Sequence, residues 1–144
     1  MGIRDVKHIL AAAQAFTTDA VSENDLNLAA ASKELGLGGR PLFVHFLTTV
    51  AAGGAASGVR LAIVDDTVTI ATGTSRIISE TGILTAAQLA INREWCLPVP
   101  PGKLQQYLGA RVIPVSEAIT GMTMNIWIDD VPPRALTILG EVTG

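Results

Sequence analysis

Apolar and polar residues alternate with a period of two along most of this chain, from about residue 14 onward. The clearest case is GMTMNIWIDD, in which Met122, Met124, Ile126 and Ile128 share one face and Trp127 lies on the other. Successive side chains of a β-strand point to opposite faces of a sheet, so this period predicts strands that are buried on one side. A helical bundle is excluded for the body of the chain, because its pattern would repeat every three to four residues.

Further segments with this pattern are separated by Gly, Pro and Asp, which are common turn residues. Together they predict about eight short strands, with no long helical pattern after residue 14. This organisation is typical of an all-β protein, an antiparallel β-sandwich or jelly roll. The 144 residues suit one domain with its own core. The predicted strands lie within residues 42–50, 59–66, 67–72, 75–84, 90–97, 108–116, 121–130 and 134–142.

The first thirteen residues follow a different pattern. Ile3, Val6, Leu10 and Ala13 recur at helical spacing in an alanine-rich stretch, which predicts a short N-terminal helix. An extended arm is the alternative, because chain termini become ordered only when they dock.

A proline-rich stretch, EWCLPVPPGKLQQYLGARV, separates two predicted strands. Proline cannot donate to a sheet ladder, so Pro98 ends the first strand or places it at an edge. Leu104, Tyr107 and Leu108 share one face if KLQQY forms a helical turn. We interpret the whole stretch as a rigid corner that takes the chain from one sheet to the other.

Composition excludes several classes of protein. The net charge is −3 and the ten Lys and Arg residues form no run, which argues against nucleic-acid binding. One cysteine, Cys96, excludes an internal disulfide. No apolar run approaches the length of a membrane span, and the N-terminal apolar stretch is too short for a signal peptide. Charged residues are only 16% of the chain, which favours buried surface between subunits and therefore a homo-oligomer, a dimer or a trimer.

Residues that could carry chemistry are few and scattered. His45 has no histidine or acid within two residues, so we expect a packed or hydrated strand residue and no metal site. Cys96 would need a base from elsewhere in the fold and is expected to be a small core residue. The pairs Asp65-Asp66 and Asp129-Asp130 are expected to be solvated acids at strand ends. No cofactor, metal or catalytic residue is predicted, and we expect a protein that is not an enzyme.

Two features indicate interaction surfaces. Trp127 lies on the polar face of its strand, where it either covers the end of the core or anchors a partner, since Trp is enriched in interface hot spots. The second feature is the segment RALTILGEV, residues 134–142, which is either an ordinary strand or a C-terminal tail that pairs with the sheet edge of another subunit. The candidate interface residues are Trp127, Leu136, Ile138 and Leu139.

The order of these segments resembles the jelly-roll capsid cement, or decoration, proteins of tailed bacteriophages. The resemblance covers residues 13–130 and is most specific at LPVPPGKLQQYLGARVIPV. It is supported by AQAFTTDAVSENDLNL, GGRPLFVHFLTTV, AAGGAASGVRLAIVDD and GMTMNIWIDD. The stretch SRIISETGILTAAQLAINREWC carries more charge than the family pattern.

The resemblance implies a structural virion protein that binds the major capsid protein on the outer surface of the phage head after synthesis in the host cytoplasm. It would stabilise the shell as an oligomer by bridging capsid subunits. The alternative is another β-sandwich binding module, a phage tail component or a carbohydrate binder.

Overall fold

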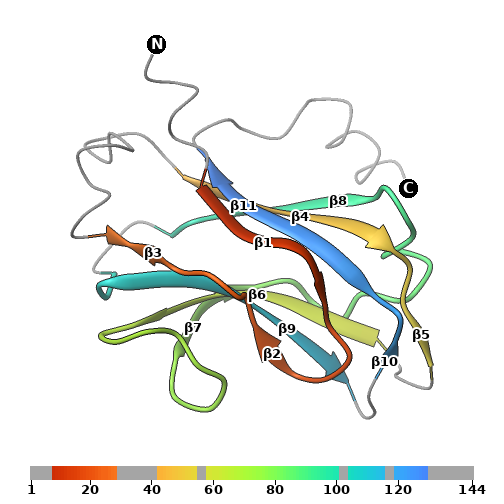
Figure 1. Ribbon diagram of the computed structural model, residues 1–144, viewed down its shortest axis with the longest axis horizontal. Coiled ribbons are helices and arrows are strands. Elements are labelled where there is room, and N and C mark those ends of the chain that lie inside the picture. The colour runs from red at the N-terminus through yellow and green to blue at the C-terminus, as the bar shows by residue number, and fades with distance from the viewer. Residues whose placement is uncertain (1–7, 29–41, 55–57, 101–103, 116–118, 130–144) are drawn as a thin grey trace.

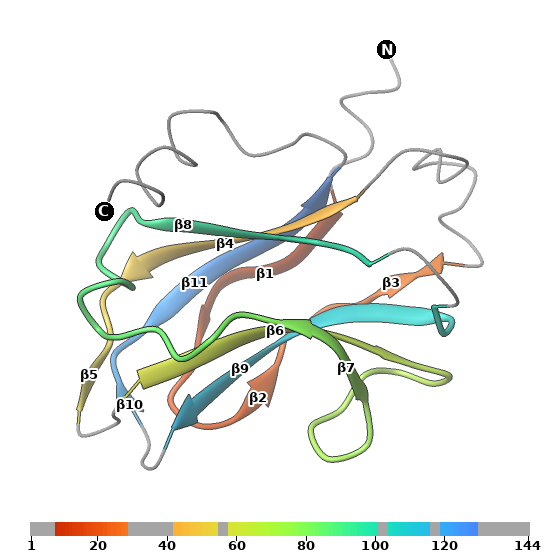
Figure 2. The ribbon, with the colours of Figure 1, turned by 180° about the vertical axis from the view of Figure 1, so that it is seen from behind.

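The computed structural model describes residues 8–28, 42–54, 58–100, 104–115 and 119–129 (Figures 1 and 2). These residues form eleven strands: β1 (His8–Ala15), β2 (Ala20–Val21), β3 (Leu26–Asn27), β4 (Phe43–Val50), β5 (Gly53–Gly54), β6 (Gly58–Asp66), β7 (Arg76–Glu80), β8 (Glu94–Pro98), β9 (Tyr107–Val115), β10 (Ile119–Thr120) and β11 (Thr123–Asp129).

The strands are arranged as two antiparallel sheets packed face to face. One has the order β1-β11-β4-β8; the other has the order β2-β9-β6-β7, with β3 also pairing with β9. The strands β5 and β10 form a small third pair. If β2 and β3 are taken as one interrupted strand, the two sheets hold four strands each in the order of a jelly roll. The predicted all-β antiparallel sandwich is therefore confirmed.

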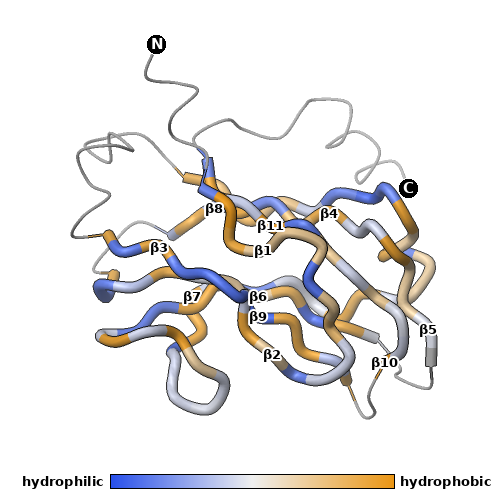
Figure 3. The backbone as a smooth tube through the Cα atoms, in the orientation of Figure 1, coloured by the Kyte–Doolittle hydropathy of each residue, from blue (hydrophilic) through white to orange (hydrophobic). Residues whose placement is uncertain are grey.

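The alternation of apolar residues builds the core as the sequence predicts. In β11, Met124, Ile126 and Ile128 are fully buried, as are Val44 and Phe46 of the adjacent β4. The opposite sheet contributes residues of β6 and β9, and Figure 3 shows apolar positions recurring along the strands of both sheets. Burial of each such large side chain contributes about 1.5–3 kcal/mol.

The prediction of an N-terminal helix is wrong for the described residues, because His8–Ala15 form the edge strand β1. Leu10 and Ala11 are both fully buried although they are consecutive. The pairing with β11 is irregular between Ile9 and Ala11 and again between Ala11 and Gln14, and Ala13 has a φ of 50°. These bulges break the period of two and so imitate helical spacing. Residues 1–7 of the predicted arm lie outside the described residues.

The proline corner crosses between the sheets as predicted, from β8 in one to β9 in the other. The predicted helical turn, however, is not found at residues 104–106, which are not helical. There the backbone bonds to distant segments: the Gln105 amide donates to Asp65 over 2.9 Å, and the Gln106 carbonyl accepts from the Leu28 amide over 2.7 Å. These bonds take the groups that a helical turn would use. Pro114 lies two residues beyond Val112, the last residue of β9 that pairs with β2, so it interrupts no ladder on that side.

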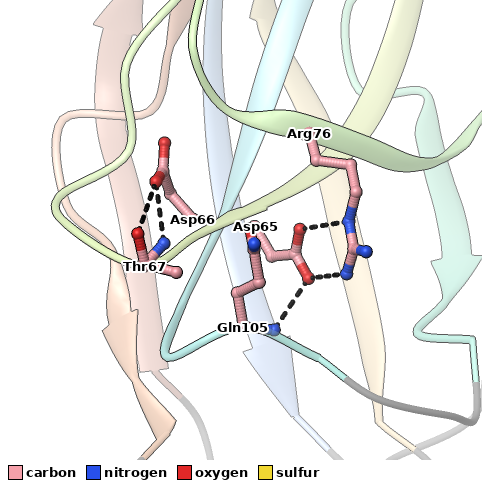
Figure 4. A network of polar contacts seen from close by, with 5 residues as sticks. All are labelled: Asp65, Asp66, Thr67, Arg76 and Gln105. Carbon is pink, nitrogen blue, oxygen red and sulfur yellow. Dashed lines mark hydrogen bonds and ion pairs between the residues drawn. The ribbon is translucent and has the colours of Figure 1, made fainter.

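Two buried acids organise the far end of β6 (Figure 4). The Asp65 carboxylate is fully buried and accepts two hydrogen bonds from the Arg76 guanidinium, at 3.0 and 2.7 Å. Asp66 accepts from the Thr67 amide at 2.7 Å and from the Ser75 hydroxyl at 3.0 Å. The expectation that these acids are solvated is therefore wrong. Residues 67–72, predicted as a strand, belong instead to the loop between β6 and β7. Asp66 holds both ends of this loop, through Thr67 and Ser75.

We expect the fold to lose stability in acid partly through Asp66. The Ser75 hydroxyl is the main cause that lowers the pKa of Asp66 below its ordinary 3.8; burial opposes it, and the Val68 and Thr67 amides reinforce it. A carboxylate with a lowered pKa stabilises the fold above its ordinary pKa, and this contribution is lost as the pH falls through the lowered value. Ser75→Ala should therefore flatten the loss of unfolding free energy measured by urea titration below about pH 4. Ser79→Ala on β7 is the control, and an unchanged slope in Ser75→Ala would contradict the assignment.

Gly58, the first residue of β6, lies close to residues 83–84. A Cβ added at Gly58 would lie 2.3 Å from Ile83 Cγ2 and 2.9 Å from the Leu84 carbonyl oxygen, whereas one added at Gly82 meets nothing within 4 Å. Gly58→Ala should cost about 1–3 kcal/mol of unfolding free energy, as overpacking does, and Gly82→Ala less than about 0.5 kcal/mol. Chemical denaturation of both variants tests this, and equal stabilities would show that the strand shifts freely.

Candidate functional site

A row of four side chains crosses the outer face of the β1-β11-β4-β8 sheet. Ile9 pairs with Trp127, Trp127 with His45, and His45 with Cys96, so one residue from each strand lies at the same level. Each has neighbours along its strand that face the core, which places all four on the opposite face. We call Ile9, Trp127, His45 and Cys96 the outer row.

His45 is the centre of a bridge between three strands. Its Nδ1 lies 2.9 Å from Glu94 Oε2 on β8, and its Nε2 lies 2.9 Å from Asp129 Oδ1 on β11. Each ring nitrogen therefore lies within hydrogen-bonding distance of a carboxylate oxygen. His45 is only 4% exposed, so removal of either partner would leave a buried polar atom without a hydrogen bond, which is costly. The bridge fixes the relative position of β8, β4 and β11 on this face.

Trp127 covers this bridge. Its ring is stacked on the His45 imidazole with centroids 5.1 Å apart and planes within 5° of parallel. Its indole Nε1 donates to Asp129 Oδ2 over 3.1 Å, so the ring is held at its edge and on one face. Trp127 remains half-buried and Ile9 is 44% exposed, which leaves two large apolar side chains at the surface of the row. Fixed aromatic side chains of this kind lose little entropy on binding.

The structure thus places Trp127 on the outer face, as the alternation predicts, and its role as an anchor stays a prediction. The other three candidate interface residues, Leu136, Ile138 and Leu139, lie outside the described residues.

The sequence reasoning missed the partners of His45. No acid lies within two residues of His45 in the sequence, whereas Glu94 and Asp129 reach its ring across the sheet from 49 and 84 residues away. A usable signal was present: polar residues occupy outward positions in the middle or at the end of three otherwise apolar strands. Asp129 is only 8% exposed, so the expectation of a solvated acid was wrong here too.

Cys96 lies beside His45 but gains no base from it, because both ring nitrogens are bonded to carboxylates. Burial raises the pKa of the Cys96 thiol from 9.0 to about 12, and the charges of Glu94 and Asp129 act in the same direction. The thiol form is therefore strongly favoured, which disfavours a nucleophilic role.

A hollow of about 400 Å³ lies away from the outer row, between residues 21–25 and residues 69–70. Its acids are already engaged with backbone amides: Glu23 accepts from Ala12 over 3.3 Å, and Asp25 accepts from Ile70 over 3.3 Å. Across the described residues, no group of three or more His, Cys, Asp and Glu could hold a metal ion. In the same part of the chain, no helix has the length and apolar character needed to cross a membrane.

The state of Cys96 can be tested by alkylation. At about pH 8 the folded protein should react with iodoacetamide about a hundredfold more slowly than the urea-unfolded chain, because it holds far less thiolate. Glu94→Gln, which removes one nearby negative charge, should raise the rate in the folded protein. Equal rates in the folded and unfolded chains would instead show an activated or exposed thiol.

Comparison with known proteins agrees with a phage origin for this arrangement. None of the curated proteins compared with the chain matches it. The sequence model of the Bbp16 family matches residues 10–125, which include all of β2 to β10 and the start of β11. Since this match covers most of the chain, the protein belongs to the Bbp16 family, a family associated with bacteriophages.

Proposed function

We propose that this protein is a structural virion protein that binds the outer surface of a phage head and stabilises the shell by bridging capsid subunits. The observation that carries the proposal is the outer row on a jelly roll of a phage family. The partner is the major capsid protein, and the copies associate with one another on the shell as dimers or trimers. The protein acts in the virion, on the outside of the capsid, after synthesis in the host cytoplasm.

The physical support is preorganisation. Four strands are joined by antiparallel pairing, and the His45 bridge ties three of them together on the outer face. A surface that is already rigid loses little conformational freedom when it binds, so a small contact can hold well. Binding energy at such surfaces concentrates in a few large side chains, which here are Trp127 and Ile9.

We propose no catalytic activity. The histidine of the outer row has both nitrogens bonded to carboxylates, and the cysteine beside it favours its thiol form. A binding role needs neither group to react, whereas nucleophilic catalysis needs a thiolate and a free base.

The second candidate is a carbohydrate-binding module or tail component. It is favoured by Trp127, a half-buried aromatic ring beside the acceptor oxygens of Asp129. Sugars stack on such rings, but Asp129 Oδ1 and Oδ2 are already used by His45 and Trp127. A glycan-binding screen with the intact protein distinguishes this candidate from capsid binding.

The capsid proposal is tested by co-sedimentation with heads that lack this protein. Trp127→Ala should weaken attachment by about 2 kcal/mol or more, roughly thirtyfold in dissociation constant, if Trp127 is a hot spot. Val68→Ala, at a 63% exposed position in the β6–β7 loop, should bind normally. Ile9→Lys, on the edge strand, should weaken binding independently of the His45 bridge.

Melting curves by circular dichroism accompany each variant. Normal binding by both Trp127→Ala and Ile9→Lys would place the capsid contact on another surface. Unfolding of Trp127→Ala alone would show that the indole serves mainly to cover the His45 bridge.

A further inference from the structure

The hollow between residues 21–25 and residues 69–70 has the size of a ligand site. Its volume of about 400 Å³ lies within the range of small-molecule sites, about 300–1,000 Å³. One wall is the segment that joins β2 to β3, and the other is part of the loop between β6 and β7. Both walls flank strands of the β2-β9-β6-β7 sheet, whereas the outer row belongs to the other sheet.

Both walls of the hollow are held in place by the fold. The Ser22 hydroxyl is buried and accepts from the Ala110 amide over 3.2 Å, which ties the first wall to β9. In the second wall, Ile70 is buried against Gly109, where an added Cβ would lie 2.1 Å from the Ile70 Cδ1. The Ile70 amide donates to Asp25 Oδ2 over 3.3 Å, so the two walls are also joined to each other. A ligand would therefore meet a preformed site and would lose little affinity to ordering of the loops.

The hollow carries two acids and no cationic side chain. Glu23 and Asp25 line it, and its other lining residues are uncharged. Each carboxylate uses one oxygen to accept from a backbone amide over 3.3 Å. The nearby His8 ring contacts the backbone carbonyl of Asp25, with 3.1 Å between the two atoms. Within the described part of the chain neither carboxylate forms an ion pair, so one oxygen of each is left for a ligand.

Other acids of the fold have charged or ring partners. Asp19, Asp65 and Glu80 each pair with an arginine. Glu94 and Asp129 both contact the His45 ring. The two acids of the hollow differ from these, and a cation supplied from outside would complete them in the way that the arginines complete the others.

The rest of the lining indicates a cation with an aliphatic stem. Val21 and Ile70 place apolar groups beside the acids. A metal ion is not favoured, because the described residues bring together no group of three or more His, Cys, Asp and Glu. An arginine side chain meets both conditions: its stem packs on apolar groups, and its planar guanidinium donates to acceptors on two residues at once. A lysine ammonium is a more strongly hydrated point charge and suits two acceptors less well.

We propose that the hollow is a recognition site for an arginine side chain of a partner protein. The guanidinium donates to the free oxygens of Glu23 and Asp25, and the aliphatic stem packs against Val21 and Ile70. The site shares no residue with the outer row, so it goes beyond the proposed function and does not depend on it.

The test is an NMR titration of the intact protein with Nα-acetyl-arginine methylamide, which mimics an arginine within a chain. Backbone amide shifts of residues 21–25 and 69–70 should change and saturate, with a dissociation constant of about 1–10 mM for so small a ligand. Nα-acetyl-citrulline methylamide has nearly the same shape without the charge and should bind about tenfold or more weakly. Added salt should weaken binding of the arginine derivative, because it screens exposed charges.

Two substitutions test the assigned acids, and a third is their control. Glu23→Gln and Asp25→Asn each keep an oxygen that can accept from the backbone amide bound now, so both variants should fold. Each should weaken binding of the arginine derivative about threefold or more, and the two together about tenfold or more. Glu80→Gln removes the same charge from an acid that already pairs with Arg60, and it should bind like the unmodified protein. Melting curves by circular dichroism accompany each variant.

Several results would overturn the proposal. One is an arginine derivative that shifts no amide of the hollow, and another is an affinity that the double substitution leaves unchanged. Equal binding of the arginine and citrulline derivatives would show that charge is not recognised. Binding of spermidine about tenfold tighter than the arginine derivative would assign the hollow to a free polyamine. The titration contains no heads, so its failure would leave the proposed function intact, and loss of head binding in Trp127→Ala would leave this site intact.

Discussion

The pairing of β6 with β9 is the constraint on which the rest of this sandwich depends. Nine consecutive residues of β6 pair with nine of β9, and almost all of β6 is buried. The next-to-last residue of the ladder is Asp65, whose carboxylate has no exposure. A buried charge is tolerated only when it is paired and hydrogen-bonded. The partners of Asp65 come from two other segments: Arg76 begins β7, and the Gln105 amide lies just before β9 (Figure 4). One carboxylate therefore positions both the edge strand and the exit of the proline corner.

The fold class could be read from the sequence because it depends on local alternation. The spacing of residues such as Met124, Ile126 and Ile128 predicts that they share one face of a strand, and all three are buried in the structure. The errors occurred where a non-local bond decided the local structure. The segment His8–Ala15 has helical propensity, but it takes its hydrogen bonds from β11 and accommodates two bulges in doing so. Residues 104–106 could form a turn in isolation, but their backbone groups bond to Asp65 and Leu28.

The site was less predictable than the fold, for a related reason. The outward position of Trp127 follows from its strand, but its contacts follow from register, which one sequence does not state. Shifting β8 by one residue against β4 would move Glu94 to the other face and remove it from His45. The buried acids were misread because an acid at a strand end is usually solvated; here Arg76, Ser75 and His45 compensate them from distant positions.

The proposed bridging of capsid subunits would need two surfaces that can be occupied at once. In this jelly roll the outer row belongs to the β1-β11-β4-β8 sheet, whereas the hollow between residues 21–25 and residues 69–70 flanks the other sheet. A partner on one therefore does not cover the other, and each is stiffened by its own polar network, around His45 and around Asp66. Both networks include a buried acid, Asp129 in one and Asp66 in the other. The low proportion of charged residues in the chain, 16% against about 25% in typical soluble domains, agrees with the proposed use of more than one contact surface.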